Sequence, residues 1–289
     1  MVGLSWGLLS TMAVVTALPH TVLPRDGKTY QIVGCTAAQQ KKLTTAFEDA
    51  VKLASAADDI DDDSTAFSHY LRKDDKKETK KLWKAVAKVN SDDSPYKFNV
   101  RCDKCLENPA RQVLRRPSAI AYGHEANVSA KSLAYTNPSP ADDDNPVPEM
   151  TICPAFFTNA GTKNDLASKS YIPDKRNSWC QTDYKFKDFE TAGHTILHEL
   201  THFDAVGDEG DLPEATDEGI TSHGTIDVTG FGDDYVPAAR AFLQKWVADP
   251  DTMKKDDGPK PYQNAENVAA AATEWWFNNK CTNIDNIDL

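Results

Sequence analysis

The sequence has no long hydrophobic run. Although 40% of its 289 residues are hydrophobic, the apolar stretch near its start, residues 8–17, spans only about ten residues, whereas a membrane-spanning helix needs about 20. No later stretch reaches about 18 apolar residues either. The sequence therefore predicts a protein that does not cross or bind a membrane.

Positive charge is also scarce. Lys and Arg total 32 against 44 Asp and Glu, which gives a formal net charge of −12 and a pI near 5.0. Proteins that bind nucleic acid or anionic membranes carry basic patches, so nucleic acid is not an expected partner. The chain also has no internal repeat and no phosphate-binding loop, so neither a repeat protein nor a P-loop enzyme is expected.

The first 17 residues have the composition of a secretory signal. They carry no charged side chain, contain the apolar run 8–17 and end in Val15-Thr16-Ala17, a site that signal peptidase accepts. We expect residues 1–17 to be a signal peptide, 18–30 a loose leading segment or short pro-segment, and 31–289 a single domain. The mature protein is then secreted, extracellular and monomeric.

The six cysteines fit an oxidising compartment. An even number in a secreted chain predicts three disulfides, with fifteen pairings open; they are Cys35, Cys102, Cys105, Cys153, Cys180 and Cys281. The C-x-x-C at residues 102–105 has no second copy to complete a zinc knuckle, so structural disulfides are favoured. Asn127-Val128-Ser129 is an acceptor sequence for N-glycosylation and predicts a glycoprotein.

Hydrophobic periodicity predicts a mostly helical chain with a few short strands. Apolar residues recur three and four apart, as in amphipathic helices, in residues 37–57, 64–89, 189–206, 235–248 and 265–278. Short β-like runs occupy residues 96–102, 119–122, 129–135 and 150–157. Residues 208–224 read as a polar loop, and the aromatic residues 275–277 as core.

The most informative motif is His198-Glu199-Leu200-Thr201-His202. A helix places residues four apart on one face, so both imidazoles aim at one point, where a single Zn²⁺ ion fits, while the glutamate lies close enough to hold the attacking water. The alternative is an ordinary charged helix face. The regular apolar spacing of residues 189–206 favours the zinc site.

A catalytic zinc needs a third protein ligand besides the two histidines. No H-x-x-G-x-x-H and no helix carrying a zinc-type glutamate follows the motif, but Gly224-Thr225-Ile226-Asp227 ends 25 residues after His202. His194 lies one turn before His198, too far along a straight helix to share the ion, and is expected in the core or behind the site. His223 is expected to be a supporting loop residue.

With this ligand pattern the sequence resembles the deuterolysin family of secreted fungal metalloendopeptidases, the aspzincins. Their third ligand is the aspartate of a G-T-x-D-x-x-Y-G segment, which Gly224, Thr225 and Asp227 match; the segments 153–157 and 264–267 also resemble the family, and the resemblance covers residues 30–289. It implies a zincin-like α+β catalytic domain, mostly helical with a small sheet and stabilised by disulfides. It also implies one Zn²⁺ held by His198, His202 and Asp227, and protein or peptide substrates.

The sequence departs from the family pattern at three points. The family tyrosine is matched only by Phe231, displaced by one residue, so Tyr235 is the expected substitute in catalysis. A competing alignment makes Asp234 the third ligand. Glu266 matches a position that lines the substrate pocket in the lysine-specific branch, but its partner position is Ala269, which argues against lysine specificity.

The leading hypothesis is hydrolysis of internal peptide bonds by a zinc-activated water, with Glu199 as the general base. A rival is a secreted zinc-binding protein on the same fold, with little or no turnover, that captures metal or binds a host partner. A third hypothesis is a disulfide-stabilised adhesin or virulence factor with a vestigial site.

Overall fold

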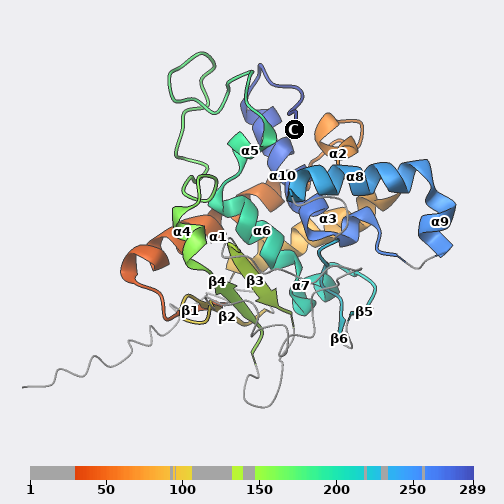
Figure 1. Cartoon of the computed structure of the whole chain (residues 1–289), viewed down its shortest axis with the longest axis horizontal. Helices are drawn as coiled ribbons and strands as arrows, with labels where there is room; N and C mark the ends of the chain where they lie inside the picture. The colour runs from red at the N-terminus through yellow and green to blue at the C-terminus, as the bar shows by residue number, and fades with distance from the viewer. Residues whose placement is uncertain are drawn as a thin grey trace, which may run out of the picture.

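The computed structural model shows an α+β fold in which a group of helices lies beside a small four-stranded mixed sheet (Figure 1). It describes residues 30–91, 94, 96–105, 132–138, 147–217, 220–228, 234–255 and 258–289. The expected signal peptide, most of the segment 18–30, Asn127 and the run 119–122 lie outside these residues. None of the described helices combines the length and the apolar character that a bilayer-spanning helix needs.

The main sheet has four strands in the order β1-β2-β4-β3. Strands β1 (Tyr30–Val33), β2 (Phe98–Arg101) and β4 (Glu149–Ile152) run parallel, whereas β3 (Ala134–Asn137) runs antiparallel to β4. Among the described strands, β3 is therefore an edge strand, whereas β4 has a paired strand on each side. An edge strand presents backbone groups to which another chain can pair.

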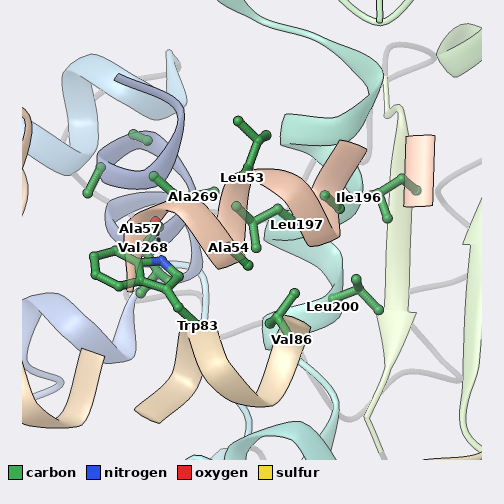
Figure 2. Packing of buried hydrophobic residues seen from close by; sticks show 14 of the residues in the cluster. Leu53, Ala54, Ala57, Trp83, Val86, Ile196, Leu197, Leu200, Val268 and Ala269 are labelled. Carbon is green, nitrogen blue, oxygen red and sulfur yellow. Dashed lines mark hydrogen bonds between the residues drawn. The ribbon is translucent and has the colours of Figure 1, made fainter. Parts of the chain in front are cut away.

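Four helices form the hydrophobic core against the sheet. They are α1 (Ala37–Ala57), α3 (Lys76–Ala87), α6 (Ala192–Thr201) and α10 (Ala265–Lys280). Figure 2 shows their buried side chains meeting, with Trp83 of α3 between α1 and α10, and its indole Nε1 donates to the Val268 carbonyl oxygen at 3.2 Å. Helix α6, which also adjoins β3, is thus held on several sides.

Helix α6 packs closely on α1 because Gly193 has no side chain. A Cβ at this position would lie 2.6 Å from Cβ of Asp49 and 3.2 Å from the backbone nitrogen of Ala50. The Asp49 carboxylate, buried beside it, accepts from the backbone N–H of Leu166 at 2.8 Å. The contact fixes the position of α6 relative to the rest of the core.

The remaining elements lie around this core. They are α2 (Thr65–Ser68), η1 (Lys73–Asp75), η2 (Lys88–Asn90), α4 (Pro154–Thr158), α5 (Phe186–Phe189), α7 (Asp204–Glu209), the hairpin β5 (Ala215–Asp217) and β6 (Ile220–Ser222), α8 (Tyr235–Ala248), α9 (Pro250–Lys255) and η4 (Pro261–Gln263).

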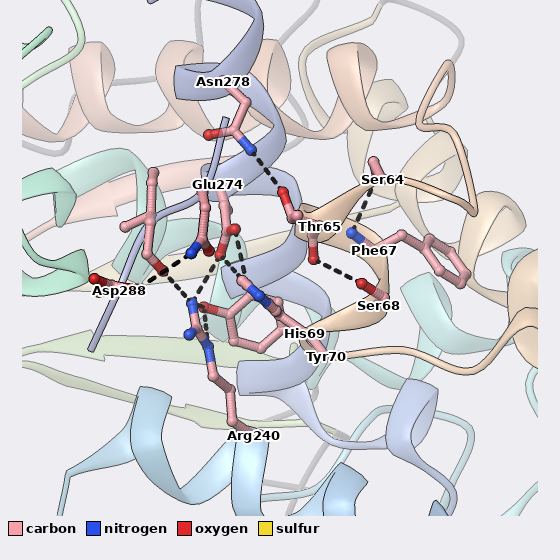
Figure 3. Close-up of polar contacts among 12 residues, drawn as sticks. Ser64, Thr65, Phe67, Ser68, His69, Tyr70, Arg240, Glu274, Asn278 and Asp288 are labelled. Carbon is pink, nitrogen blue, oxygen red and sulfur yellow. Dashed lines mark hydrogen bonds and ion pairs between the residues drawn. The ribbon is translucent and has the colours of Figure 1, made fainter. Parts of the chain in front are cut away.

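A buried polar network joins α2, α8, α10 and the C-terminal segment (Figure 3). Glu274, fully buried on α10, pairs with Arg240 at 2.9 Å and with His69 Nδ1 at 2.9 Å. The Arg240 guanidinium also donates to the Tyr70 hydroxyl and, at 2.6 Å, to the Ile287 carbonyl oxygen. A buried carboxylate needs such partners, and here they tie down the chain after α10.

Three disulfides join the six cysteines, as predicted: Cys35–Cys102, Cys105–Cys153 and Cys180–Cys281. The two cysteines of the C-x-x-C motif have different partners, which agrees with a structural rather than a metal-binding role. The first two bonds link the ends of β1, β2 and β4, and the third links a loop to the end of α10. Covalent links of this kind restrict the unfolded chain.

The prediction of a single helix over residues 189–206 was wrong. The backbone is extended at Glu190, and Thr191 caps α6 by accepting from the His194 N–H at 3.3 Å. The backbone is extended again at Phe203, so α7 begins separately. A capping threonine and a turn that buries Phe203 therefore override the continuous apolar period.

Other predicted elements also have different bounds. Residues 64–89 form α2, η1, α3 and η2 rather than one helix, because Arg72 is extended and the preceding turn buries Tyr70 and Leu71. The strand expected over 150–157 ends at Ile152, since Pro154 begins α4. The expected polar loop 208–224 contains the end of α7 and the hairpin β5–β6.

Candidate metal centre

Helix α6 brings the two histidines of the H-E-x-x-H motif together. His198 lies within the helix and is 8% exposed, and His202 follows its last residue with φ −74° and ψ −20°, so it keeps the helical direction. The two Nε2 atoms are 3.3 Å apart. The spacing of four residues thus aims both rings at one point, as the sequence predicts.

Asp227 completes the cluster. Its Oδ1 atom lies 3.1 Å from Nε2 of His198 and 3.5 Å from Nε2 of His202. Nitrogen and oxygen ligands about 2.0–2.1 Å from a tetrahedral zinc are about 3.3–3.4 Å apart, so these three atoms have the spacing of one face of such a site. Within the described part of the chain, this is the one trio of possible ligands that gathers so closely.

Asp234, the competing candidate, is not part of that trio. It is an exposed residue at the start of α8, and its side chain makes no capping hydrogen bond. The structure thus brings Asp227 rather than Asp234 to the histidines.

Hydrogen bonds on the far side of each ring fix which nitrogen faces Asp227. Nδ1 of His202 lies 2.8 Å from the carbonyl oxygen of Thr225. Because a carbonyl only accepts, Nδ1 carries a hydrogen, so in the neutral ring Nε2 keeps its lone pair. Nδ1 of His198 lies 2.8 Å from Oε2 of Glu266, with the same consequence, so both Nε2 lone pairs are available to a metal ion.

Charges within the trio stabilise one another. Burial lowers the pKa of both histidines, but the Asp227 carboxylate more than offsets this, so the pKa of His198 lies well above its usual range and that of His202 is also raised. Burial raises the pKa of Asp227, but the two imidazoles lower it well below its usual range. The carboxylate and the two imidazoles therefore favour opposite charges on one another.

The Gly-Thr-Ile-Asp segment is anchored on both sides. The Thr225 N–H donates to the Thr201 carbonyl oxygen at 2.9 Å, and the two threonine hydroxyls share a hydrogen bond of 2.6 Å. Ile226 pairs with the backbone around Asn264, whose side-chain oxygen accepts from the Val228 N–H at 3.0 Å. These bonds hold Asp227 between α6 and the start of α10.

Gly224 is required by a close backbone approach. A Cβ at this position would lie 2.0 Å from the His202 carbonyl oxygen and 2.6 Å from its carbonyl carbon. We expect Gly224→Ala to destabilise the protein by about 1–3 kcal/mol and to weaken zinc binding, because the backbone of His202 or of the Asp227 segment has to move. Thermal unfolding and a zinc titration measure both effects.

Gly258→Ala is the matched control for that substitution. A Cβ at residue 258 would lie 3.7 Å from its nearest neighbour, the Met253 carbonyl oxygen. This substitution should therefore change neither the stability nor the zinc affinity by much. If the two variants have the same stability and zinc affinity, the close approach of Gly224 to His202 is not required for folding or for zinc binding.

Glu199 lies beside the trio, and a residue of the sheet binds its side chain. It is 6% exposed, and its Oε2 accepts from the Thr136 hydroxyl of β3 at 2.8 Å. Burial raises the pKa of Glu199, and the neighbouring histidines only partly oppose this. A carboxylate with a raised pKa next to a metal-bound water is suited to take up a proton.

Tyr235 is positioned near the trio as expected. It is the first residue of α8, is 66% exposed, and its ring meets the ring of His198 edge to face with centroids 6.1 Å apart. The family tyrosine position and Phe231 lie outside the described residues.

Glu266 does not line an open pocket, contrary to the expectation from the lysine-specific branch. It is 5% exposed, and its two carboxylate oxygens accept from His198 Nδ1 at 2.8 Å and from His194 Nε2 at 3.1 Å. Burial raises the pKa of Glu266, but the two histidines lower it to about 2. Glu266 therefore lies behind the metal ligands, on the side away from Asp227.

His194 and His223, the two histidines near the motif that were not expected to bind the metal, lie where the sequence suggested. His194 is buried behind the site, and His223 is a loop residue whose Nδ1 lies 3.2 Å from Oδ1 of Asp204. Sequence reasoning missed the roles of Thr136, Thr201 and Thr273, because their contacts with the site are distant in sequence. The sequence pointed to these supporting contacts only through the family resemblance, at the Gly-Thr pair and in the segment 264–267.

Comparisons with known proteins give a distant structural likeness. No protein-family model matches this chain, and no curated protein does. Among solved structures, a zinc peptidase from Grifola frondosa is similar, with 15% sequence identity and a TM-score of 0.42, over 85% of this chain and 98% of that one. At this distance, an assignment of function depends on the geometry of the residues themselves.

Proposed function

We propose that the protein is a zinc-dependent endopeptidase of the aspzincin type on a zincin-like fold, with one Zn²⁺ held by His198, His202 and Asp227. The observation that carries the proposal is the triangle of 3.3, 3.1 and 3.5 Å between the three donor atoms, beside a buried glutamate. When bound, zinc lowers the pKa of a coordinated water and polarises the scissile carbonyl. The rest of the chemistry belongs to this chain's own residues.

Glu199 is the general base in this proposal. It takes a proton from the attacking water and delivers it to the leaving amine, which is why one carboxylate both accepts and donates. The Thr136 hydroxyl, 2.8 Å from Oε2, fixes the carboxylate while leaving Oε1 for the water. Tyr235 is the expected donor to the developing oxyanion.

The edge strand β3 is the proposed binding strand for an extended peptide. Strand β4 is enclosed by β2 and β3, whereas β3 pairs only with β4 among the described strands. A substrate added along β3 passes Thr136, whose hydroxyl contacts both the backbone carbonyl oxygen and the side chain of Glu199. The scissile bond is thereby brought beside the general base.

The same proposal includes the location, the domain organisation and the oligomeric state of the enzyme. Three disulfides fit an oxidising compartment. Together with the leader composition of residues 1–17, they support a secreted, extracellular protein with one catalytic domain over residues 31–289. We propose that this domain acts as a monomer on protein or peptide substrates.

Metal content and cleavage of an unfolded protein, measured on one preparation, test the proposal. We expect one zinc per chain, cleavage at internal peptide bonds, loss of cleavage with a zinc chelator, and recovery when zinc is restored. Zinc binding without cleavage between about pH 4 and pH 8 would instead support the zinc-binding protein. A chain that binds no zinc would exclude both.

Zinc binding should depend on pH with a definite sign. The pKa values of His198 and His202 are raised in the metal-free protein, so protons compete with zinc until the pH exceeds these raised values. Affinity should therefore rise as the pH increases from about 5 to 8, with release of protons on binding. Isothermal titration in buffers of different ionisation enthalpy measures the released protons, and a pH-independent affinity would argue against this ligand set.

A further inference from the structure

Behind the metal trio, a chain of hydrogen bonds leads from His198 to α10. The Glu266 carboxylate bridges two histidines, with Oε2 on Nδ1 of His198 at 2.8 Å and Oε1 on Nε2 of His194 at 3.1 Å. Nδ1 of His194 in turn lies 2.9 Å from the Thr273 hydroxyl. All of these side chains are buried, and Thr273 is fully so.

The bonds leave His194 no capacity to bind the metal itself. A carboxylate only accepts, so Nε2 of His194 donates to Glu266, and in the neutral ring Nδ1 accepts the hydroxyl hydrogen of Thr273. Both ring nitrogens are therefore occupied. The ring also packs edge to face on Phe186, with centroids 5.8 Å apart, which fixes its plane.

Glu266 needs such a second partner to orient His198. A glutamate side chain has three rotatable bonds, and a single hydrogen bond to His198 leaves its other oxygen buried without a partner, which is costly. His194 binds that oxygen from the preceding turn of α6. The carboxylate is thereby fixed between two rings of one helix.

We propose that His194 and Thr273 are positioning residues for the metal centre, which hold Glu266 so that it fixes the ring orientation and tautomer of the ligand His198. The inference rests on the proposed metal site and deepens it. Outer partners of ligating histidines commonly change metal affinity by about 10- to 100-fold when they are removed. A purely structural role for the same residues would instead affect folding alone.

Two pairs of variants separate these roles. His194→Phe keeps a ring but removes both hydrogen bonds, whereas His194→Gln retains an N–H donor that can reach Glu266. Thr273→Val removes the hydroxyl at nearly constant volume, whereas Thr273→Ser keeps it. Thr79→Val is the matched control, because the Thr79 hydroxyl is equally buried in α3 but binds only the Asp75 carbonyl oxygen.

Zinc dissociation constants from competition with a chelator are the main readout. We expect a loss of affinity of about 10- to 100-fold in His194→Phe, a smaller loss of roughly 3- to 10-fold in Thr273→Val, and recovery of most of the affinity in His194→Gln and Thr273→Ser. The visible spectrum of the cobalt-loaded protein, which reports ligand geometry, should change in the first two variants and stay as in the unmodified protein in Thr79→Val.

The melting temperature of each metal-free variant controls for folding. If Thr273→Val and His194→Phe fold normally and bind zinc and cobalt as the unmodified protein does, the positioning role is excluded. The same holds if Thr79→Val weakens zinc binding as much as Thr273→Val. An unmodified protein that binds no zinc overturns the proposed metal site itself, which is a different outcome.

Discussion

Glu199→Gln should lower the rate of peptide hydrolysis by about 10²- to 10⁴-fold, the range that general acid–base catalysis contributes, while zinc stays bound. The amide keeps the shape of the side chain and still accepts the hydrogen bond from Thr136, but it cannot take a proton from water. The initial rate of cleavage of a quenched fluorescent peptide and the zinc content of the same sample give the two readouts.

Glu48→Gln is the control for that substitution. Glu48 is an exposed residue of α1, so its replacement makes the same chemical change far from the reaction. If Glu199→Gln retains more than about a tenth of the unmodified rate, Glu199 is not the base. If it loses zinc together with activity, its contribution is to the structure of the site.

Asp227→Asn should weaken zinc binding by more than about 100-fold, beyond the range usual for outer partners of a metal site. The substitution removes the charge that faces both Nε2 atoms at 3.1 and 3.5 Å. The effect on the stability of the metal-free protein should be small, because the Asp227 side chain is 49% exposed and half-exposed ion pairs contribute little. Competition with a chelator measures the affinity, and thermal unfolding measures the stability.

Asp234→Asn is the matched control, since it makes the same change seven positions further along the chain. Its side chain is exposed and caps no helix, so zinc affinity should stay within about a factor of two of the unmodified value. The reverse pattern, with loss of zinc in Asp234→Asn and not in Asp227→Asn, would favour the competing alignment of the sequence.

The parts of the site that follow from local geometry were predictable from the sequence. His198 and His202 converge because a helix repeats every 3.6 residues, and that holds whatever surrounds the helix. The helices predicted over residues 37–57 and 235–248 have the predicted bounds. Thr36 precedes the first of these helices and caps it, and its hydroxyl and Gln39 form a capping box.

Bounds that depend on distant contacts were not predictable in this way. The break between α6 and α7 occurs where Phe203 turns into the core, and Gly207 is a packing position within α7. A Cβ on Gly207 would lie 1.9 Å from the His223 carbonyl oxygen. Gly207 and His223 belong to different segments of the chain, and the hydrophobic periodicity of the sequence does not indicate that these segments meet.

The supporting side chains of the site were the least predictable. Thr136 reaches Glu199 across 63 positions of sequence, and Glu266 reaches His198 across 68. The resemblance singled out Glu266 but suggested a place in the substrate pocket. The N–H groups of the two histidines explain the difference, because a buried carboxylate between two N–H donors is more stable there than in an apolar pocket without partners.

The central claim is that one zinc ion is bound by His198, His202 and Asp227. Diffraction from crystals of the zinc-loaded protein, collected on both sides of the zinc absorption edge, locates the ion directly. The account predicts a single anomalous peak about 2.0–2.2 Å from Nε2 of both histidines and from a carboxylate oxygen of Asp227. A peak at any other place, or a zinc bound by the histidines without Asp227, would contradict it.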